Sequence, residues 1–264
     1  MNDSAARMRE HLLQGEAVHT REGVAALGTF IIELPTPATV RAIALAGFDF
    51  VIIDLEHSSM SLDTVEQLIS EARGCGLTCL VRVPNDQPSL IGRVLDVGAN
   101  GVMVPHVSTA AEAAAVVAQA RFSPEGQRGF SPLTMFSALN CPQQQLNDAC
   151  LVIVQIEGKE GLSNAGPIAA TAGVDAVFVG PYDLAESLGT PSDITSPEVL
   201  SAVASIAADV PRQVLLGIYM DDPGKSQFWR DEGFLLQCIG YDGQMLYERA
   251  REVLRLVSSA VPAL

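Results

Sequence analysis

Lysine is nearly absent from this chain, whose 264 positions hold only Lys159 and Lys225. An enzyme that works through a Schiff base needs a lysine in a dry interior, where burial lowers the pKa of its amine. Lys225 lies in a polar stretch, and Lys159 follows Gly158 beyond the end of an apolar run. The sequence therefore disfavours chemistry through a Schiff base.

Positive charge is scarce as a whole, and the formal net charge at pH 7 is −15. A chain this acidic is a poor partner for nucleic acid, whose backbone is itself negatively charged. No apolar run approaches the length of a membrane span, and the N-terminal segment carries charges where a signal peptide needs an apolar core. We therefore expect neither a nucleic-acid nor a membrane partner.

The five cysteines are odd in number, and no two of them form a CxxC pair. A disulfide framework uses an even set, and a structural zinc site uses closely spaced Cys or His residues. The sequence indicates neither of these. We expect reduced thiols and a cytoplasmic protein.

What the sequence does contain is a repeating unit: an apolar run, a polar exit, then an Ala- and Leu-rich stretch. Apolar strands that alternate with helices predict a parallel sheet covered on both faces. Eight such units without a linker favour a closed barrel over an open sheet. The prediction is an α/β fold, a single (β/α)8 TIM barrel domain over residues 1–264. The expected strands are Leu27–Leu34, Phe48–Leu55, Leu77–Val83, Gly101–Pro105, Leu151–Ile156, Ala176–Val179, Val214–Tyr219 and Phe234–Ile239.

Two further helices are expected at the ends of the chain. Ser4–Gln14 is expected to cross the bottom of the barrel. Gly243–Val257 is expected to be the last helix, and apolar residues recur along it at a spacing that fits one helical face. That face needs cover, either from the chain's own barrel or from another subunit.

In a (β/α)8 barrel the working residues project from the C-terminal ends of the strands. Glu157 and Asp183 follow two neighbouring strands, and carboxylate oxygens are ligands that suit Mg²⁺ or Mn²⁺. A structural interpretation is equally open at this point. Glu157 could pair with Arg82 or Lys159, and Asp183 could cap the helix that follows.

A histidine and an arginine follow the second and third strands. His57 lies three residues after Asp54, and a carboxylate that holds one ring nitrogen would fix the tautomer and raise the basicity of the other. Glu56 is a rival partner, but alternation along the strand points it away. A lone histidine is more often structural than catalytic. Arg82 could neutralise a carboxylate or an enolate, or form an ion pair at the barrel mouth.

Four segments carry a resemblance to a known family: 54–57 (DLEH), 81–84 (VRVP), 155–157 (QIE) and 180–184 (GPYDL). Taken in this order, they resemble the HpcH/HpaI aldolases, metal-dependent class II enzymes of the phosphoenolpyruvate/pyruvate barrel group. The resemblance extends over residues 25–245. It implies a reversible retro-aldol cleavage of a 4-hydroxy-2-oxo acid to pyruvate and an aldehyde.

The same resemblance implies roles for the residues at the strand ends. Glu157 and Asp183 would ligate the metal, which would be Mg²⁺ or Mn²⁺, with Co²⁺ as a further candidate. Arg82 would contact the keto oxygen and stabilise the enolate. His57, oriented by Asp54, would assist proton transfer, directly or through metal-bound water.

The pyruvate carboxylate would be held by Gln155 and by the backbone around Gly180, Pro181 and Tyr182. Two positions depart from the family: Tyr182 stands where small or polar residues are common, and Tyr241 where Ser is frequent. These departures leave the metal and pyruvate half unchanged and make the aldehyde partner an open question.

Family members are usually hexamers that exchange C-terminal helices, so the resemblance implies a homohexamer in which Gly243–Val257 is exchanged. Two other interpretations remain at this point. A citrate-lyase-like enzyme acting on a CoA thioester would want several basic residues for the phosphates. A barrel that only binds would be expected to lack the ligand residues.

Overall fold

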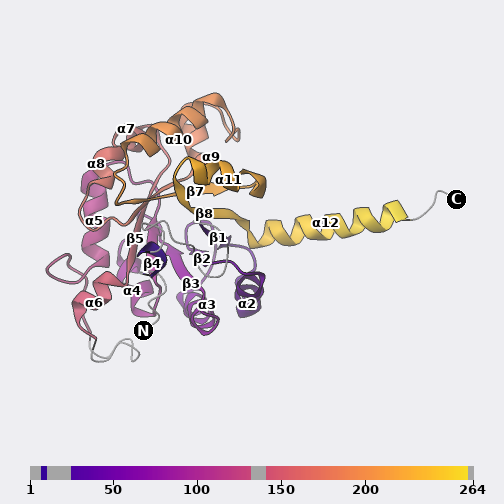
Figure 1. The fold of residues 1–264 in the computed structure, drawn as a ribbon. Helices are drawn as coiled ribbons and strands as arrows, with labels where there is room; N and C mark the ends of the chain where they lie inside the picture. The colour runs from indigo at the N-terminus through magenta and orange to yellow at the C-terminus, as the bar shows by residue number, and fades with distance from the viewer. Residues whose placement is uncertain (1–6, 11–24, 132–140, 261–264) are drawn as a thin grey trace.

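Eight parallel strands close into a barrel in the computed structural model, which describes residues 7–10, 25–131 and 141–260 (Figure 1). The strands pair in chain order, and the last pairs with the first. This arrangement confirms the predicted (β/α)8 barrel. The strands are β1 (Ala26–Ile31), β2 (Phe50–Asp54), β3 (Thr78–Arg82), β4 (Gly101–Val104), β5 (Leu151–Ile156), β6 (Ala176–Val179), β7 (Leu215–Met220) and β8 (Phe234–Tyr241).

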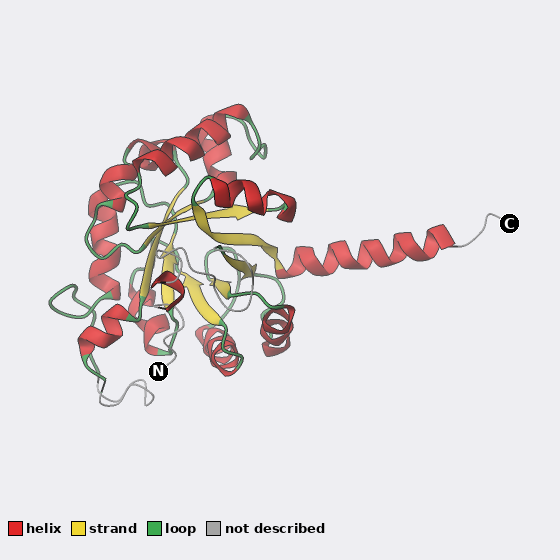
Figure 2. Ribbon diagram, viewed as in Figure 1, coloured by secondary structure: helices red, strands yellow, loops and turns green. Residues whose placement is uncertain are grey.

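Helices surround the barrel and cover its outer face (Figure 2). Ser61 and Ser196 begin two of them, and each side chain accepts a hydrogen bond from the backbone N–H three residues on. The helices are α2 (Pro37–Ala46), α3 (Leu62–Gly74), α4 (Ser89–Asp96), α5 (Ala110–Ala120), α6 (Gln143–Asp148), α7 (Lys159–Ser163), α8 (Ala165–Ala169), α9 (Pro181–Leu188), α10 (Pro197–Asp209), α11 (Ser226–Asp231) and α12 (Asp242–Ala260), with a 3-10 turn η2 at Pro223–Lys225.

The strands are apolar on both faces because each face meets a different part of the core. One set of buried side chains packs inside the barrel, among them Phe50, Leu80 and Phe178. The alternate set, such as Val51 and Val81, packs between the strands and the helices. Alternation along each strand thus explains the continuous apolar runs of the sequence.

The bottom of the barrel is closed near the N-terminus. Residues 7–10 are helical, Met8 is buried against the inner cluster, and Arg9 Nε lies 3.1 Å from Asp175 Oδ1. The rest of the helix predicted over Ser4–Gln14 lies outside the described residues. With this end covered, access to the barrel interior is from the opposite end, where the strands terminate.

Helix α12 leaves the barrel and points away from it (Figure 1). Its first residue, Asp242, is buried and accepts hydrogen bonds from the backbone N–H groups of Ile32, Glu33 and Leu34 at 3.2, 3.1 and 2.8 Å. These contacts fix the start of the helix to the exit of β1. No helix in the described part of the chain is long and apolar enough to span a membrane.

Candidate active site

A cavity of about 230 Å³ lies at the C-terminal ends of the strands. It contains every candidate site residue except Asp54, which is fully buried beside it. The residues that line the cavity are Phe30, Ile32, His57, Arg82, Gln155, Glu157, Phe178, Gly180, Pro181, Tyr182, Asp183, Tyr219 and Tyr241. Side chains from the second, third, fifth and sixth strand exits therefore converge on one space.

Arg82 is held by two carboxylates at the floor of this cavity. β2 and β3 pair in parallel with Asp54 opposite Arg82, so the two side chains meet at adjacent strand ends. Arg82 Nε and Nη2 donate to the two oxygens of Asp54 at 2.8 and 2.7 Å, and Nη1 lies 3.2 Å from Glu56 Oε2. Burial alone would lower the pKa of Arg82, but these carboxylates raise it above its ordinary value. The guanidinium is therefore charged and fixed in orientation.

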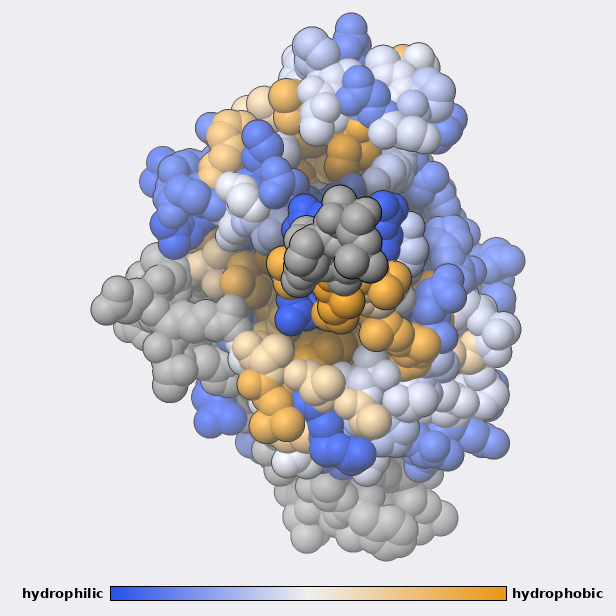
Figure 3. All heavy atoms as spheres, turned by 90° about the vertical axis from the view of Figure 1, so that its right-hand side faces the viewer, coloured by the Kyte–Doolittle hydropathy of each residue, from blue (hydrophilic) through white to orange (hydrophobic). Residues whose placement is uncertain are grey.

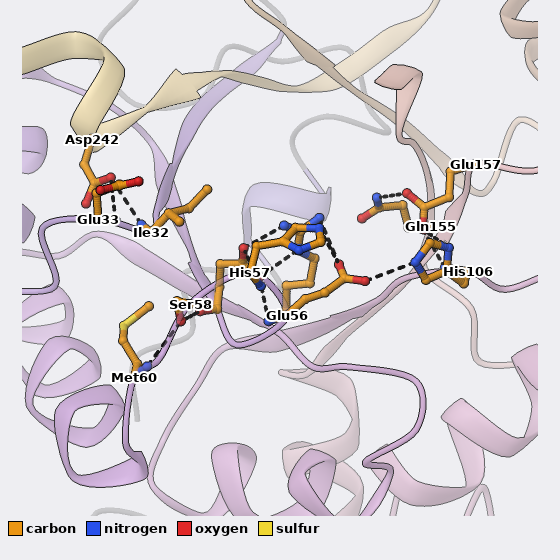
Figure 4. Close-up of polar contacts among 12 residues, drawn as sticks. Ile32, Glu33, Glu56, His57, Ser58, Met60, His106, Gln155, Glu157 and Asp242 are labelled. Atoms are coloured by element: carbon orange, nitrogen blue, oxygen red, sulfur yellow. Dashed lines mark hydrogen bonds and ion pairs between the residues drawn. The ribbon is translucent and has the colours of Figure 1, made fainter. Parts of the chain in front are cut away.

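The ring of His57 is placed differently from the expectation. Asp54 does not hold it, because Arg82 takes both carboxylate oxygens, and Asp54 accepts only the backbone N–H of His57, at 3.3 Å. The nearest carboxylate to the ring is Glu56, with His57 Nε2 3.7 Å from Glu56 Oε2 (Figure 4). β2 ends at Asp54, so strand alternation no longer applies to Glu56, which turns back toward the site.

Glu157, at the end of β5, is nearly inaccessible to solvent. Its Oε1 accepts the backbone N–H of His106 at 2.7 Å, and the Gln155 amide donates to Oε2. Burial raises the pKa of Glu157 to about 7, whereas His106 opposes the rise and nearby Asp183 adds to it. The alternative that Glu157 forms an ion pair with Arg82 or Lys159 is therefore not seen, because its ion-pair partner is His106.

His106 was not singled out from the sequence, yet it connects the two halves of the site. Its ring lies between two carboxylates, with Nε2 3.1 Å from Glu56 Oε1 and Nδ1 3.0 Å from Glu157 Oε1 (Figure 4). The backbone adopts φ 57°, a left-handed conformation that is uncommon outside glycine. The only signal in the sequence is its place directly after the fourth strand, which it shares with many structural loop residues.

The residues that could hold a metal fit a hard divalent cation. Asp183 lies exposed in the first turn of α9, and this helix begins at Gly180 without a side-chain cap, so the capping alternative is not seen. Gln155 Oε1 is buried without a hydrogen-bond partner among the described residues. A Cβ at position 180 would collide with the Glu157 carboxylate, so glycine preserves the space in front of it.

The protein offers this cation two carboxylates rather than a complete ligand set. Within the described part of the chain, no three His, Cys, Asp or Glu side chains form a metal-binding cluster. Mg²⁺ is commonly bound in this way, through one or two carboxylates, with water and substrate oxygens in the other positions. The donor set is thus typical of a site where metal and substrate bind together.

A larger hollow of about 560 Å³ lies on the other side of His106, between α4 and α5. Its lining is mostly apolar, and its one carboxylate, Glu112, already accepts the backbone N–H groups of Ser108 and Thr109. It brings together no set of charged groups comparable to that around Arg82. The barrel-mouth cavity is therefore the candidate active site.

Known proteins that resemble this chain include aldolases and lyases. The model of the HpcH/HpaI aldolase/citrate lyase family matches residues 28–248. A 5-keto-4-deoxy-D-glucarate aldolase from Klebsiella pneumoniae subsp. pneumoniae is 39% identical over 68% of this chain and 71% of its own length.

Solved structures show the same relationship. An HpcH/HpaI aldolase/citrate lyase family protein from Burkholderia cenocepacia is 32% identical, covers 96% of this chain and 99% of its own, and superposes with a TM-score of 0.83. An HpcH/HpaI aldolase from Desulfitobacterium hafniense is 28% identical, with coverages of 90% and 94% and a TM-score of 0.84. The chain therefore belongs to the HpcH/HpaI aldolase/citrate lyase family, and it is a carbon–carbon lyase of the metal-dependent aldolase class.

Proposed function

We propose that this enzyme cleaves a 4-hydroxy-2-oxo acid reversibly to pyruvate and an aldehyde. The observation that carries the proposal is a fixed arginine, Arg82, facing the same cavity as the paired carboxylates Glu157 and Asp183. In the cleavage direction the C3–C4 bond breaks, and its electron pair becomes the enolate of pyruvate. The C4 hydroxyl loses its proton to become the aldehyde, and C3 gains a proton.

Glu157 and Asp183 would hold the cation, for which we propose Mg²⁺ or Mn²⁺, with Co²⁺ as a further candidate. When bound, it would polarise the keto group and help to neutralise the enolate. Arg82 would contact the keto oxygen, since its charge is fixed by Asp54 and Glu56 before substrate arrives.

The substrate carboxylate would be held beside Gln155 and the start of α9, where Gly180, Pro181 and Tyr182 line the cavity. The backbone N–H groups in the first turn of a helix have no partner within the helix and favour an anion. His57 would move the proton at the C4 hydroxyl. Its ring lines the cavity, is 60% exposed, and has Glu56 rather than Asp54 as its nearest carboxylate.

The CoA-thioester alternative finds little support in this site. Among the described lining residues, Arg82 is the one permanently cationic side chain, and it is already paired with two carboxylates. The phosphates of CoA would need several free cations. A change in melting temperature with acetyl-CoA in the presence of Mg²⁺ would be the result that favours this alternative.

We further propose a homohexamer built through α12, and a cytoplasmic location. The first rests on the row of apolar side chains that α12 exposes, and the second on five free thiols.

The test is a pyruvate-formation screen over 4-hydroxy-2-oxo acids. EDTA should abolish activity, and Mg²⁺, Mn²⁺ or Co²⁺ should restore it. Glu157→Gln should lose both activity and Mn²⁺ binding by calorimetry, because it removes a charged ligand. Glu66→Gln on the exposed face of α3 is the matched control. Full activity in Glu157→Gln, or a wild type indifferent to EDTA, would contradict the proposal.

A further inference from the structure

One wall of the cavity is built from aromatic rings, and the Arg82 guanidinium stacks at its edge, with Cζ 4.7 Å from the centroid of the Phe30 ring. Tyr182 comes from the start of α9, Tyr219 from β7 and Tyr241 from the end of β8, and all three line the cavity with Phe30. The ring centroids of Tyr182 and Tyr219 are 6.0 Å apart, and those of Tyr219 and Phe30 are 6.1 Å apart. The rings of Tyr182, Tyr219 and Phe30 thus follow one another along the cavity, and together with Tyr241, which also lines it, they are called the tyrosine wall here.

The hydroxyls of Tyr182 and Tyr219 both donate to Asp221, which does not line the cavity. The Tyr219 hydroxyl donates to Asp221 Oδ1 at 2.7 Å, and the Tyr182 hydroxyl donates to Oδ2. Burial raises the pKa of Tyr182 to about 12, and Asp221 adds to the rise, so the phenol keeps its proton at neutral pH. What these two residues offer to a ligand is therefore mainly ring surface.

Charge in this part of the site disfavours an anion. Asp221 is a half-buried carboxylate directly behind the tyrosine wall. Arg82 is paired with Asp54 and Glu56, and the described lining holds no other arginine and no lysine. A second anionic group beside Tyr182 and Tyr219 would therefore meet the Asp221 carboxylate, while Arg82, the one arginine of the described lining, is already paired with two acids.

We infer that the aldehyde portion of the substrate is an uncharged aromatic group, recognised by stacking on the tyrosine wall and selected against negative charge by Asp221. The inference rests on the proposed retro-aldol function and specifies its second substrate. Aromatic pairs prefer offset or edge-to-face contacts, which the tilted rings at this wall can offer from more than one side. The two parts of the substrate would then bind in different parts of the cavity. The 2-oxo acid would lie beside Glu157 and Arg82, and the aromatic group beside Tyr182 and Tyr219.

An aromatic aldehyde would set this enzyme apart from the relatives to which it is similar in sequence. Those relatives are named for 5-keto-4-deoxy-D-glucarate, which carries a carboxylate at each end. A site for such a compound needs a partner for the second carboxylate, and the described tyrosine wall presents rings and an acid instead.

The experiment uses three acceptor aldehydes of similar size with pyruvate and the Mn²⁺-loaded enzyme: benzaldehyde, 4-carboxybenzaldehyde and cyclohexanecarbaldehyde. The kcat/KM of condensation should favour benzaldehyde over 4-carboxybenzaldehyde by about tenfold or more, the scale of one like charge a few ångströms away in a partly screened site. It should also favour benzaldehyde over cyclohexanecarbaldehyde by about two- to tenfold, the range of an aromatic contact.

Two substitutions assign these preferences to residues. Asp221→Asn keeps the shape of the side chain and removes its charge, so it should raise the use of 4-carboxybenzaldehyde relative to benzaldehyde. Tyr182→Leu should reduce the preference for benzaldehyde over cyclohexanecarbaldehyde. Asp222→Asn is the matched control, since Asp222 carries the same charge one residue along but accepts the N–H of Gly224 outside the cavity. Each ratio is measured within one protein, so partial loss of folded enzyme cancels.

Exchange of the pyruvate methyl protons in D₂O keeps the two proposals separable, because it needs no aldehyde. If the wild-type enzyme shows no metal-dependent exchange of these protons, the proposed function is overturned. Intact exchange together with equal or better use of 4-carboxybenzaldehyde, or efficient cleavage of 5-keto-4-deoxy-D-glucarate, would overturn the aromatic-aldehyde inference alone. Ratios that do not move in Asp221→Asn and Tyr182→Leu would equally overturn it.

Discussion

Asp54 is the residue on which the orientation and charge of Arg82 depend. It is fully buried and accepts two hydrogen bonds from the guanidinium, in addition to the backbone N–H of Glu56 at 2.9 Å. Asp54→Ala would leave Arg82 buried without the carboxylate to which it donates two hydrogen bonds, and with Glu56 as its remaining ion-pair partner. Removing one member of a buried ion pair costs about 3–5 kcal/mol, so we expect a loss of that order in the free energy of unfolding, measured with urea.

The control is the ion pair Arg41–Glu71 between α2 and α3, whose atoms lie 2.8 Å apart near the surface. Glu71→Ala should cost at most about 1 kcal/mol because water screens the pair. Similar losses in Asp54→Ala and Glu71→Ala would show that the Arg82 pair contributes mainly to function rather than to stability.

The role of His106 in positioning Glu157 can be tested by substitution, because both its backbone N–H and its ring contact the Glu157 carboxylate. His106→Ala and His106→Gly each remove the ring and keep the backbone N–H that donates to Glu157. Groups that orient a metal ligand typically contribute about 10- to 100-fold in affinity, so Mn²⁺ binding by calorimetry should weaken by about tenfold or more in both.

The two substitutions should differ in stability. At φ 57° alanine is strained and glycine is not, so His106→Gly should be more stable than His106→Ala by about 1 kcal/mol. Unchanged Mn²⁺ affinity in both variants would reduce His106 to a structural link between Glu56 and the loop after β4.

At the scale of elements, the start of α9 is packed directly against Glu157, the proposed metal ligand. A Cβ on Gly180 would overlap the Glu157 carboxylate and come within 2.7 Å of Gln155 Nε2. Gly180→Ala should therefore displace Glu157 and reduce both Mn²⁺ affinity and cleavage by at least about tenfold, the lower end of the range seen when the support of a ligand is lost. Far-ultraviolet circular dichroism should stay unchanged.

Gly74→Ala is the matched substitution, because Gly74 ends helix α3 and nothing lies within 4 Å of its added Cβ. It should leave metal binding and cleavage at wild-type values. Wild-type Mn²⁺ affinity in Gly180→Ala would mean that α9 can move aside, and that glycine here is not required by the site.

How far the sequence could predict these elements depends on periodicity. Apolar runs reflect burial within short segments, and the barrel and the strand ends predicted from them are confirmed. The start of α9 was expected too late, since a helix capped by Asp183 would begin after it, whereas α9 already begins at Pro181. The side-chain directions of Glu56 and His57 were wrong because both lie beyond Asp54, where β2 ends and alternation no longer applies. The bridge made by His106 depends on a left-handed backbone that no sequence spacing reveals.

At the scale of the whole molecule, α12 exposes an apolar face that the described part of the chain does not cover. Four of its apolar side chains are spaced as one helical face and are exposed by 59%, 44%, 67% and 61%: Leu246, Val253, Leu254 and Val257. The alternative that this face packs on the chain's own barrel is therefore not seen. Figure 3 looks along α12 from the C-terminal side and shows hydrophobic atoms gathered around it.

We expect other copies of the chain to cover this apolar face. A set of large apolar side chains this exposed on a protruding helix is unfavourable in water for a monomer, whereas closed symmetry would bury the equivalent face of every subunit at once. The anchoring of Asp242 to the exit of β1 fixes the direction in which α12 leaves the barrel, so the helix is positioned before a partner arrives.

Light scattering should therefore report a closed assembly, expected at six times the chain mass of 27.9 kDa. Leu254→Glu places a charge at the centre of the apolar face and should dissociate the assembly, since burying an unpaired carboxylate costs several kcal/mol. Leu45→Glu is the matched control, because Leu45 lies on α2 with 88% of its surface exposed and belongs to the barrel rather than to α12. It should leave the mass unchanged. A wild type that scatters as a monomer across micromolar concentrations would rule out assembly through α12, and an assembly that survives Leu254→Glu would assign the interface to another surface.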